Sequence, residues 1–172
     1  MPEPGHGRRL AQYPASAYGS PFLAYTAVTT DPGACRGLKA EQALAQWVPV
    51  YAYQFDYQDA PYYFQEMNGF EPLASHTIDI QFLFPLWHGG ILGLSEELNG
   101  PETALSNQLV GYWTRFADTG NPNGPGLQQW PRFTTGNQLI LHQNVGSSTV
   151  VDVAAQRAEH KCDFWDTILV YN

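Results

Sequence analysis

His76 is the side chain whose type and surroundings best fit acid–base chemistry. It lies in the segment Ala74–Phe84, with Asp79 three residues further on. A free imidazole titrates near pH 6.5 and so can take up and return a proton at neutral pH. A histidine in this role serves a nucleophile and is itself oriented by an acid. The sequence contains no G-x-S-x-G motif that would supply a nucleophilic serine. We therefore expect the nucleophile and the acid that act with His76 to lie outside this segment.

Two serines near His76 are weak candidates for the nucleophile. Ser95, in Gly-Leu-Ser-Glu-Glu, matches the first half of a nucleophile elbow, but Glu97 stands where a second glycine is needed for close packing. Ser75 is adjacent to His76 and points the other way if the loop is extended. Phe82, beyond the histidine, fits a pocket wall and the core equally well, as do two further aromatic residues, Phe84 and Trp87.

The remaining histidines do not form an acid–base set. His88 is placed in the turn Trp87–Gly90, which indicates a structural or exposed side chain. His6, His142 and His160 have no acid–base constellation near them in the sequence. The alternative interpretation of His76 itself is a loop histidine that makes hydrogen bonds and has no chemical role.

The elements that would position His76 follow from apolar spacing and turn signals. Residues 17–30 and 38–47 predict two short helices separated by the stop signal Asp31-Pro32-Gly33. Residues 50–55 are aromatic and β-branched on both faces, which predicts a buried strand of an α/β sheet. The turn-rich residues 56–73 then lead to His76, on a loop beyond that strand.

The second half of the chain contains the clearest helix. It begins at Pro101-Glu102, carries an aromatic stripe at spacings of three and four, and ends at Gly120-Asn121-Pro122. Residues 139–142 and 149–153 predict a small hairpin, and residues 164–169 a closing helix. The predicted order is α, α, β, long loop, α, β, β, α.

Composition and charge exclude several classes of partner. The 172 residues carry a formal net charge of −8, and 44% of them are hydrophobic. Nucleic acids and anionic membrane surfaces are bound through Lys and Arg, so neither is expected as a partner. No apolar run approaches the roughly 18 residues of a membrane span. We also expect no cofactor and no metal ion.

Two cysteines, Cys35 and Cys162, leave two interpretations open. They are either buried thiols or a disulfide, and a disulfide would imply an oxidising compartment. C-x-x-C and comparable ligand spacings are missing, which argues against a structural zinc site.

Several stretches, in this order and spacing, resemble the type B carboxylesterase/lipase family of α/β-hydrolases, which includes the cholinesterases. The stretches are Tyr13-Pro14 with Thr30-Asp31 and Cys35, Val50–Asp56, the His76 loop, Tyr112–Gly124 with Trp130-Pro131, and Lys161–Trp165. The match spans nearly the whole chain and corresponds to the C-terminal third or so of a family member. The resemblance implies that residues 1–172 are the C-terminal portion of a single α/β-hydrolase domain, with an incomplete sheet and flanking helices.

The resemblance also implies roles for individual residues. His76 matches the triad histidine, whereas Asp79 matches a Glu/Asp position that is not the triad acid and fits a local hydrogen-bonding or capping group. The family usually has Gly directly after this histidine, and this chain has Thr77. In the cholinesterase branch the positions that Cys35 and Cys162 resemble are linked, which favours the disulfide and an extracellular location.

These expectations combine into one main hypothesis, set against non-catalytic alternatives. The hypothesis is a C-terminal fragment of a serine carboxylesterase whose nucleophile, triad acid and oxyanion hole lie before Met1, so that the isolated chain is inactive. Its partners would be a small carboxylic ester in the complete enzyme and the missing N-terminal portion. The alternative is a non-catalytic binding or adhesion module of the same fold, or a small domain that binds apolar ligands in its aromatic-rich region.

Overall fold

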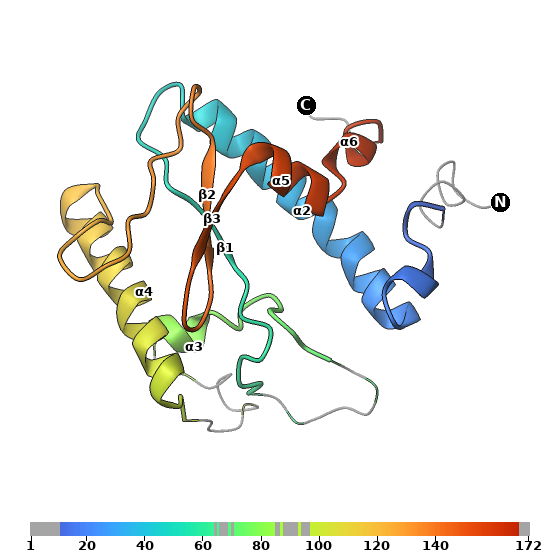
Figure 1. Ribbon diagram of the computed structural model, residues 1–172, viewed down its shortest axis with the longest axis horizontal. Helices are drawn as coiled ribbons and strands as arrows, with labels where there is room; N and C mark the ends of the chain where they lie inside the picture. The colour runs from blue at the N-terminus through green and yellow to red at the C-terminus, as the bar shows by residue number, and fades with distance from the viewer. Residues whose placement is uncertain are drawn as a thin grey trace. The chain divides into compact units, whose positions relative to one another are not determined.

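The computed structural model describes residues 11–63, 65, 69, 71–84, 87, 93 and 97–168 (Figure 1). The chain divides into two compact units. Unit 1 comprises the described residues of Met1–Val50, Phe133–Gln138 and Asp152–Asn172. Unit 2 comprises those of Tyr51–Arg132 and Leu139–Val151.

The main element of unit 1 is one long helix, α2, at Pro21–Leu44, preceded by the short 3₁₀ helix η1 at Ala15–Ala17. The Ser20 side chain caps α2 by accepting a hydrogen bond from the Leu23 amide at 3.1 Å. The two helices predicted here were wrong, because α2 runs through Pro32 without interruption. A proline inside a helix costs about 3 kcal/mol, and side chains around it that are buried in unit 1, Asp31 and Cys35, offset that cost.

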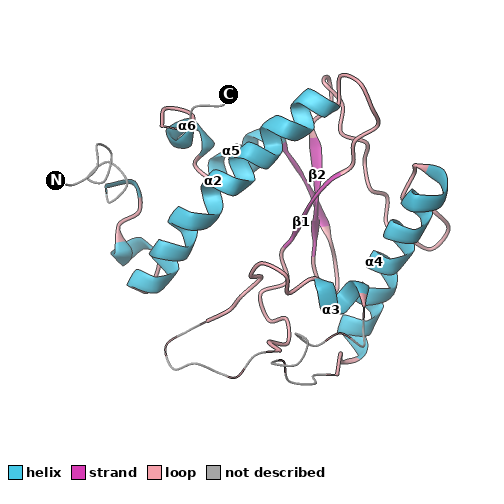
Figure 2. Ribbon diagram, turned by 180° about the vertical axis from the view of Figure 1, so that it is seen from behind, coloured by secondary structure: helices cyan, strands magenta, loops and turns pink. Residues whose placement is uncertain are grey.

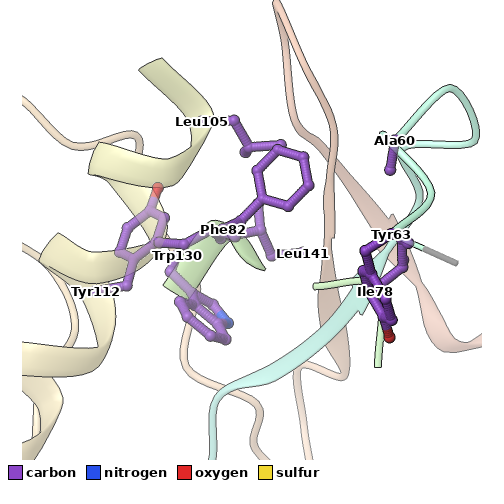
Figure 3. Close-up of a cluster of buried hydrophobic side chains, with 9 residues drawn as sticks. Ala60, Tyr63, Ile78, Phe82, Leu105, Tyr112, Trp130 and Leu141 are labelled. Carbon is purple, nitrogen blue, oxygen red and sulfur yellow. The ribbon is translucent and has the colours of Figure 1, made fainter. Parts of the chain in front are cut away.

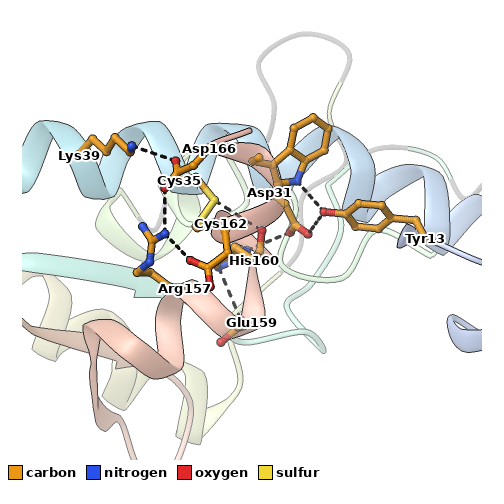
Figure 4. The surroundings of a disulfide bond; sticks show 11 residues. Tyr13, Asp31, Cys35, Lys39, Arg157, Glu159, His160, Cys162 and Asp166 are labelled. Carbon is orange, nitrogen blue, oxygen red and sulfur yellow. Dashed lines mark hydrogen bonds and ion pairs between the residues drawn. A yellow bond between two sulfur atoms is a disulfide. The ribbon is translucent and has the colours of Figure 1, made fainter. Parts of the chain in front are cut away.

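Unit 1 closes with two short helices, α5 at Val153–Glu159 and α6 at Cys162–Trp165. Helix α6 contacts both α2 and α5. A disulfide joins Cys35 of α2 to Cys162 of α6, with the two Cα atoms 5.4 Å apart (Figure 4). The predicted disulfide is therefore confirmed. The closing helix is shorter than predicted, and α5, which begins where Asp152 caps it through the Ala155 amide, was not predicted.

Unit 2 is built around a three-stranded sheet in the order β1-β2-β3. The strands are drawn in magenta in Figure 2. The strands are β1 at Ala52–Phe55, β2 at Leu139–Gln143 and β3 at Thr149–Asp152. β1 and β2 are parallel, with Ala52 opposite Ile140 and Phe55 opposite Gln143. β2 and β3 are neighbours joined by five residues, so they form the predicted hairpin and the sheet is mixed. The α/β class is confirmed. The strand predicted at residues 50–55 is found at Ala52–Phe55, but it is not buried on both faces as predicted, since Tyr53 is 40% exposed.

Helix α4, at Gly100–Thr119, packs against the short helix α3, at Ile80–Leu83. Asn99 and Glu102 form a reciprocal capping box at the start of α4, and Gly120 ends it in the left-handed conformation with φ of 71°. The predicted helix is confirmed. Its stripe is only partly core, since Leu105, Leu109 and Tyr112 are buried and Phe116 is 46% exposed.

The core of unit 2 lies between the sheet and these two helices. Phe82 of α3 and Leu141 of β2 are fully buried at its centre, with Trp130 beside them (Figure 3). The Trp130 indole donates a hydrogen bond of 2.9 Å to the Ala52 carbonyl, which joins the segment after α4 to β1. Among the helices that the structure describes, none is both long enough and apolar enough to span a membrane.

Candidate active site

His76 lies on the loop between β1 and α3, as the sequence predicts, and its side chain is exposed. The loop makes a tight turn there, because the Ile78 amide donates a hydrogen bond of 3.1 Å to the Ser75 carbonyl. The His76 imidazole makes no hydrogen bond to any residue that the structure describes. An exposed imidazole that makes no hydrogen bond within the described part of the chain can meet a reacting group from outside.

The chain on the C-terminal side of His76 is held firmly in the core of unit 2. Ile78 is 1% exposed and Phe82 is fully buried. The buried Gln81 amide donates hydrogen bonds to the Pro61 and Ile78 carbonyls, at 2.6 and 3.2 Å. The hydroxyl of Ser106 on α4 donates to the Phe82 carbonyl at 2.6 Å. The exposed His76 therefore directly precedes a segment whose backbone is held in place by buried side chains and hydrogen bonds.

Thr77 has a φ of 75°, in the left-handed region. This region is open to glycine but costs energy for a β-branched side chain. The position after His76 therefore has the backbone conformation that glycine favours, although threonine occupies it. The Thr77 hydroxyl is hydrogen-bonded to the Tyr63 hydroxyl, with the oxygens 2.5 Å apart.

Asp79 neither forms a hydrogen bond to His76, as a triad acid would, nor caps α3 with its side chain. It stands directly before α3, where its carbonyl accepts hydrogen bonds from the Phe82 and Leu83 amides. Its carboxylate makes no capping hydrogen bond, so that part of the prediction was wrong. Its charge acts instead on Tyr53, whose pKa is raised by burial and then by the negative charge of Asp79.

The structure describes only some of the other candidates. Ser75 is half-buried and contributes its carbonyl to the turn around His76. His6, His88 and Ser95 lie outside the described residues. Phe82 is core, whereas Phe84 is 65% exposed and therefore not core.

Two histidines have acid partners that the sequence analysis missed. In unit 2, the buried His142 places Nδ1 2.6 Å from Oδ2 of Asp56, just beyond the end of β1. The expectation of no acid–base constellation at His142 was wrong. The parallel register sets Gln54 opposite His142, so a correct strand pairing would have brought Asp56 close. No local spacing signals this pair, because 86 positions separate its members.

The second pair lies in unit 1, beside the disulfide. His160 Nδ1 is 3.0 Å from Oδ1 of the buried Asp31, whose other oxygen accepts a hydrogen bond of 2.7 Å from the Tyr13 hydroxyl (Figure 4). Burial raises the pKa of Tyr13 well above its usual range, and the hydrogen bond to Asp31 raises it further. The Tyr13 hydroxyl also accepts a hydrogen bond from the Trp165 indole at 2.6 Å. The expectation for His160 was likewise wrong.

Unit 2 also contains a cavity of about 260 Å³ with an aromatic wall. Its aromatic lining residues come from β1 and its entry, α4 and the segment after α4: Tyr51, Tyr53, Tyr112, Trp113, Phe116 and Trp130. The rings meet largely edge to face, with the Tyr53 and Trp113 centroids 5.0 Å apart. Among the described residues there is no group of three or more His, Cys, Asp or Glu that could hold a metal ion.

Comparison with known proteins gives a consistent result. The model of the carboxylesterase family matches residues 29–165. Mouse Carboxylesterase 5A is 36% identical over 123 residues, human Cocaine esterase is 33% identical over 125, and rat Acylcarnitine hydrolase is 33% identical over 122. Each alignment covers 70% of this chain and 20% of the relative. The chain thus spans about a fifth of the length of these relatives.

Proposed function

Because the chain belongs to the carboxylesterase family, we propose that its 172 residues are the C-terminal portion of a single α/β-hydrolase domain that hydrolyses carboxylic esters. The observation that carries this proposal is the exposed His76 on a loop anchored in the core, within the region that the family model matches. The names of the relatives, which include an esterase and an acylcarnitine hydrolase, support carboxylic esters as the substrate class.

In this proposal His76 is the general base of an acyl transfer. Its imidazole takes the proton of a serine hydroxyl as the serine attacks the ester carbonyl, and it returns that proton to the leaving alcohol. Water then attacks the carbonyl of the acyl-serine while His76 takes a proton from that water. His76 returns the proton to the serine oxygen as the acid product leaves. An exposed ring on a fixed backbone suits this role, since it must reach both the nucleophile and the leaving group.

The serine, the triad acid and the oxyanion hole are supplied from outside these 172 residues. The sequence contains no nucleophile elbow, and Asp79 lacks the position of an orienting acid. The oxyanion hole and the nucleophile provide most of the rate enhancement. The chain alone is therefore inactive.

An assay of the purified chain on p-nitrophenyl acetate tests this last step. The expected rate equals the background hydrolysis of the buffer. Turnover well above background that a serine-directed phosphonate abolishes would refute the assignment of the nucleophile to another segment.

A chimera tests the role of His76 itself. In it the aligned residues of this chain replace the aligned fifth of mouse Carboxylesterase 5A, to which they are 36% identical over 123 residues. We expect ester hydrolysis by the chimera and a loss of at least about 10³-fold in kcat with His76→Gln. Asp79→Asn, the matched control, should cost less than about tenfold. Equal losses from the two substitutions would contradict the role of His76.

The aromatic cavity supports a second candidate, a module of the same fold that binds a small apolar ligand without catalysis. Stacking and edge contacts with several rings hold an apolar or aromatic molecule. Titration with 1-naphthol should then quench tryptophan fluorescence to saturation, and Trp113→Ala should abolish the saturable part. Trp47→Ala is the control, because Trp47 is 85% exposed and belongs to unit 1. A purely linear quench would exclude this candidate.

A further inference from the structure

We propose that Tyr63 is a positioning residue for His76 and acts through the hydroxyl of Thr77, an inference that rests on the proposed role of His76. The hydrogen bond between the two hydroxyls holds the residue after His76 in a conformation that threonine otherwise avoids. We call the pair Tyr63 and Thr77 the hydroxyl clamp.

The first step is the strain at Thr77. Among the described residues, the non-glycine residues with positive φ are Leu73, Thr77 and Lys161, and Thr77 is the β-branched one. Its Cβ carries two heavy atoms, so the left-handed region crowds it more than it crowds an unbranched side chain. Such a conformation persists only where the surroundings determine it.

The second step is the rigidity of Tyr63. Its side chain is 2% exposed and belongs to the core of unit 2, as Ile78 does (Figure 3). Its ring contacts Trp87 edge to face, with the centroids 4.8 Å apart, and stacks on Tyr62 at 6.0 Å. A ring fixed on two sides fixes its hydroxyl as well. The Thr77 hydroxyl, 2.5 Å away, is therefore bound to a stationary partner.

The third step connects the clamp to His76. The Ile78 side chain is buried in the core and its amide bonds to the Ser75 carbonyl, so the turn around residues 76 and 77 closes on a fixed point. The Thr77 carbonyl accepts a hydrogen bond of 3.0 Å from the Ile80 amide, so the freedom that remains is rotation about φ of Thr77. If Thr77 moved to negative φ, the Cα–Cβ direction of His76 would swing relative to the core. The hydroxyl clamp blocks this movement. The His76 imidazole therefore stays exposed, while its Cα–Cβ bond keeps a fixed direction relative to the core.

Hydrogen exchange of the Ile78 amide in the isolated chain tests the clamp, because this amide closes the turn. Tyr63→Phe and Thr77→Val each remove one hydroxyl, and each should raise the exchange rate about tenfold. Thr77→Ser keeps a hydroxyl and should leave the rate within about twofold of wild type. The His76 ring resonances should shift in the first two variants and not in the third.

The decisive comparison uses glycine at position 77, where no clamp is needed. Thr77→Gly relieves the strain, so adding Tyr63→Phe to Thr77→Gly should change neither the exchange rate nor the ring resonances further. Tyr112→Phe controls for the loss of a buried tyrosine hydroxyl elsewhere in unit 2, since that hydroxyl donates to the Gln128 carbonyl. It should leave Ile78 unaffected.

The proposal fails if Tyr63→Phe has the same effect with Thr77 present and with Thr77→Gly, or no effect in either background. The readout needs no substrate, so it is independent of the ester assays. An inactive chimera combined with the expected exchange pattern would remove the catalytic proposal and leave the clamp standing.

Discussion

At the scale of single residues, the described histidines differ in whether an acid accompanies them. His142 and His160 are buried, and each lies within 3.0 Å of an aspartate oxygen. Such pairs satisfy polar groups that would otherwise cost energy in the interior. His76 is exposed and has no hydrogen-bond partner among the described residues. A histidine that acts with groups from another segment would have these properties.

Glu41 gives a residue-scale prediction for stability and pH. Burial raises its pKa to about 7, whereas a carboxyl in an unfolded chain titrates near 4.3. The folded state therefore holds a proton that the unfolded state has lost, so its contribution to stability is complete below about pH 4 and disappears as pH rises through 7. Glu41→Gln cannot ionise and should be more stable than wild type at pH 8, by about 1 kcal/mol after screening of a half-buried group.

Urea unfolding at pH 4.5 and pH 8 measures this effect. The difference between Glu41→Gln and wild type should be close to zero at pH 4.5. Glu71→Gln is the control, because Glu71 is exposed, and it should change the free energy of unfolding little at either pH. A gain for Glu41→Gln that is the same at both pH values would show that the carboxyl does not titrate as inferred.

At the scale of elements, α2 is the main departure from the predicted fold, and its interior glycines offer a test. Gly33 and Gly37 are helical, and a Cβ added at either would meet no atom within 4 Å apart from its chain neighbours and the nearby backbone of α2 itself. Alanine is favoured over glycine in a helix by about 0.5–1 kcal/mol. If α2 is continuous through Pro32, Gly33→Ala and Gly37→Ala should each raise the free energy of unfolding by that amount.

Chemical denaturation measures both variants. Gly120→Ala is the opposite control, since Gly120 has a φ of 71° and alanine there should be destabilising by about 1 kcal/mol. A helix broken at residues 31–33, as the sequence predicts, would instead make Gly33→Ala neutral or destabilising.

Local signals explain which elements were predictable. The capping residues Asn99 and Glu102 and the αL glycine at 120 fix the ends of α4 within a few positions, so no distant contact is needed to find it. The strand at β1 and the hairpin of β2 and β3 follow from their residue types. α2 continues through Pro32, next to Asp31, whose partner His160 is 129 positions away and so gives no local signal. Of the candidate site, only His76 and its place on a loop beyond the strand could be predicted from the sequence, because the Tyr63–Thr77 contact is tertiary.

At the scale of the whole molecule, the chain spans only about a fifth of the length of the relatives that it matches. The sheet formed by its described residues is correspondingly small, with three strands. β1 pairs with β2 on one side, and it is an edge strand of the sheet formed by the described residues. An edge strand presents unpaired backbone groups to another strand. β3 is the other edge strand, so if residues 1–172 belong to a larger hydrolase domain, as proposed, the sheet would continue at β1 or at β3.

The disulfide should stabilise unit 1 specifically, although all of unit 2 lies within the loop of the chain that it closes. Cys35 and Cys162 both belong to unit 1, with a sequence separation of 127. Cross-linking so distant a pair contributes about 2–4 kcal/mol, mainly by restricting the unfolded chain. The paired variant Cys35→Ser with Cys162→Ser should therefore lower the free energy of unfolding of unit 1 by that amount.

Hydrogen exchange resolves the two units in one experiment. Amides of α2 should lose protection in the paired variant, whereas amides of β1 and β2 should keep theirs, because their hydrogen bonds do not involve the bridge. Treatment of the wild type with a reductant should reproduce the variant, and the same treatment of the variant should change nothing. Equal losses of protection in α2 and β1 would mean that the two units unfold as one cooperative body.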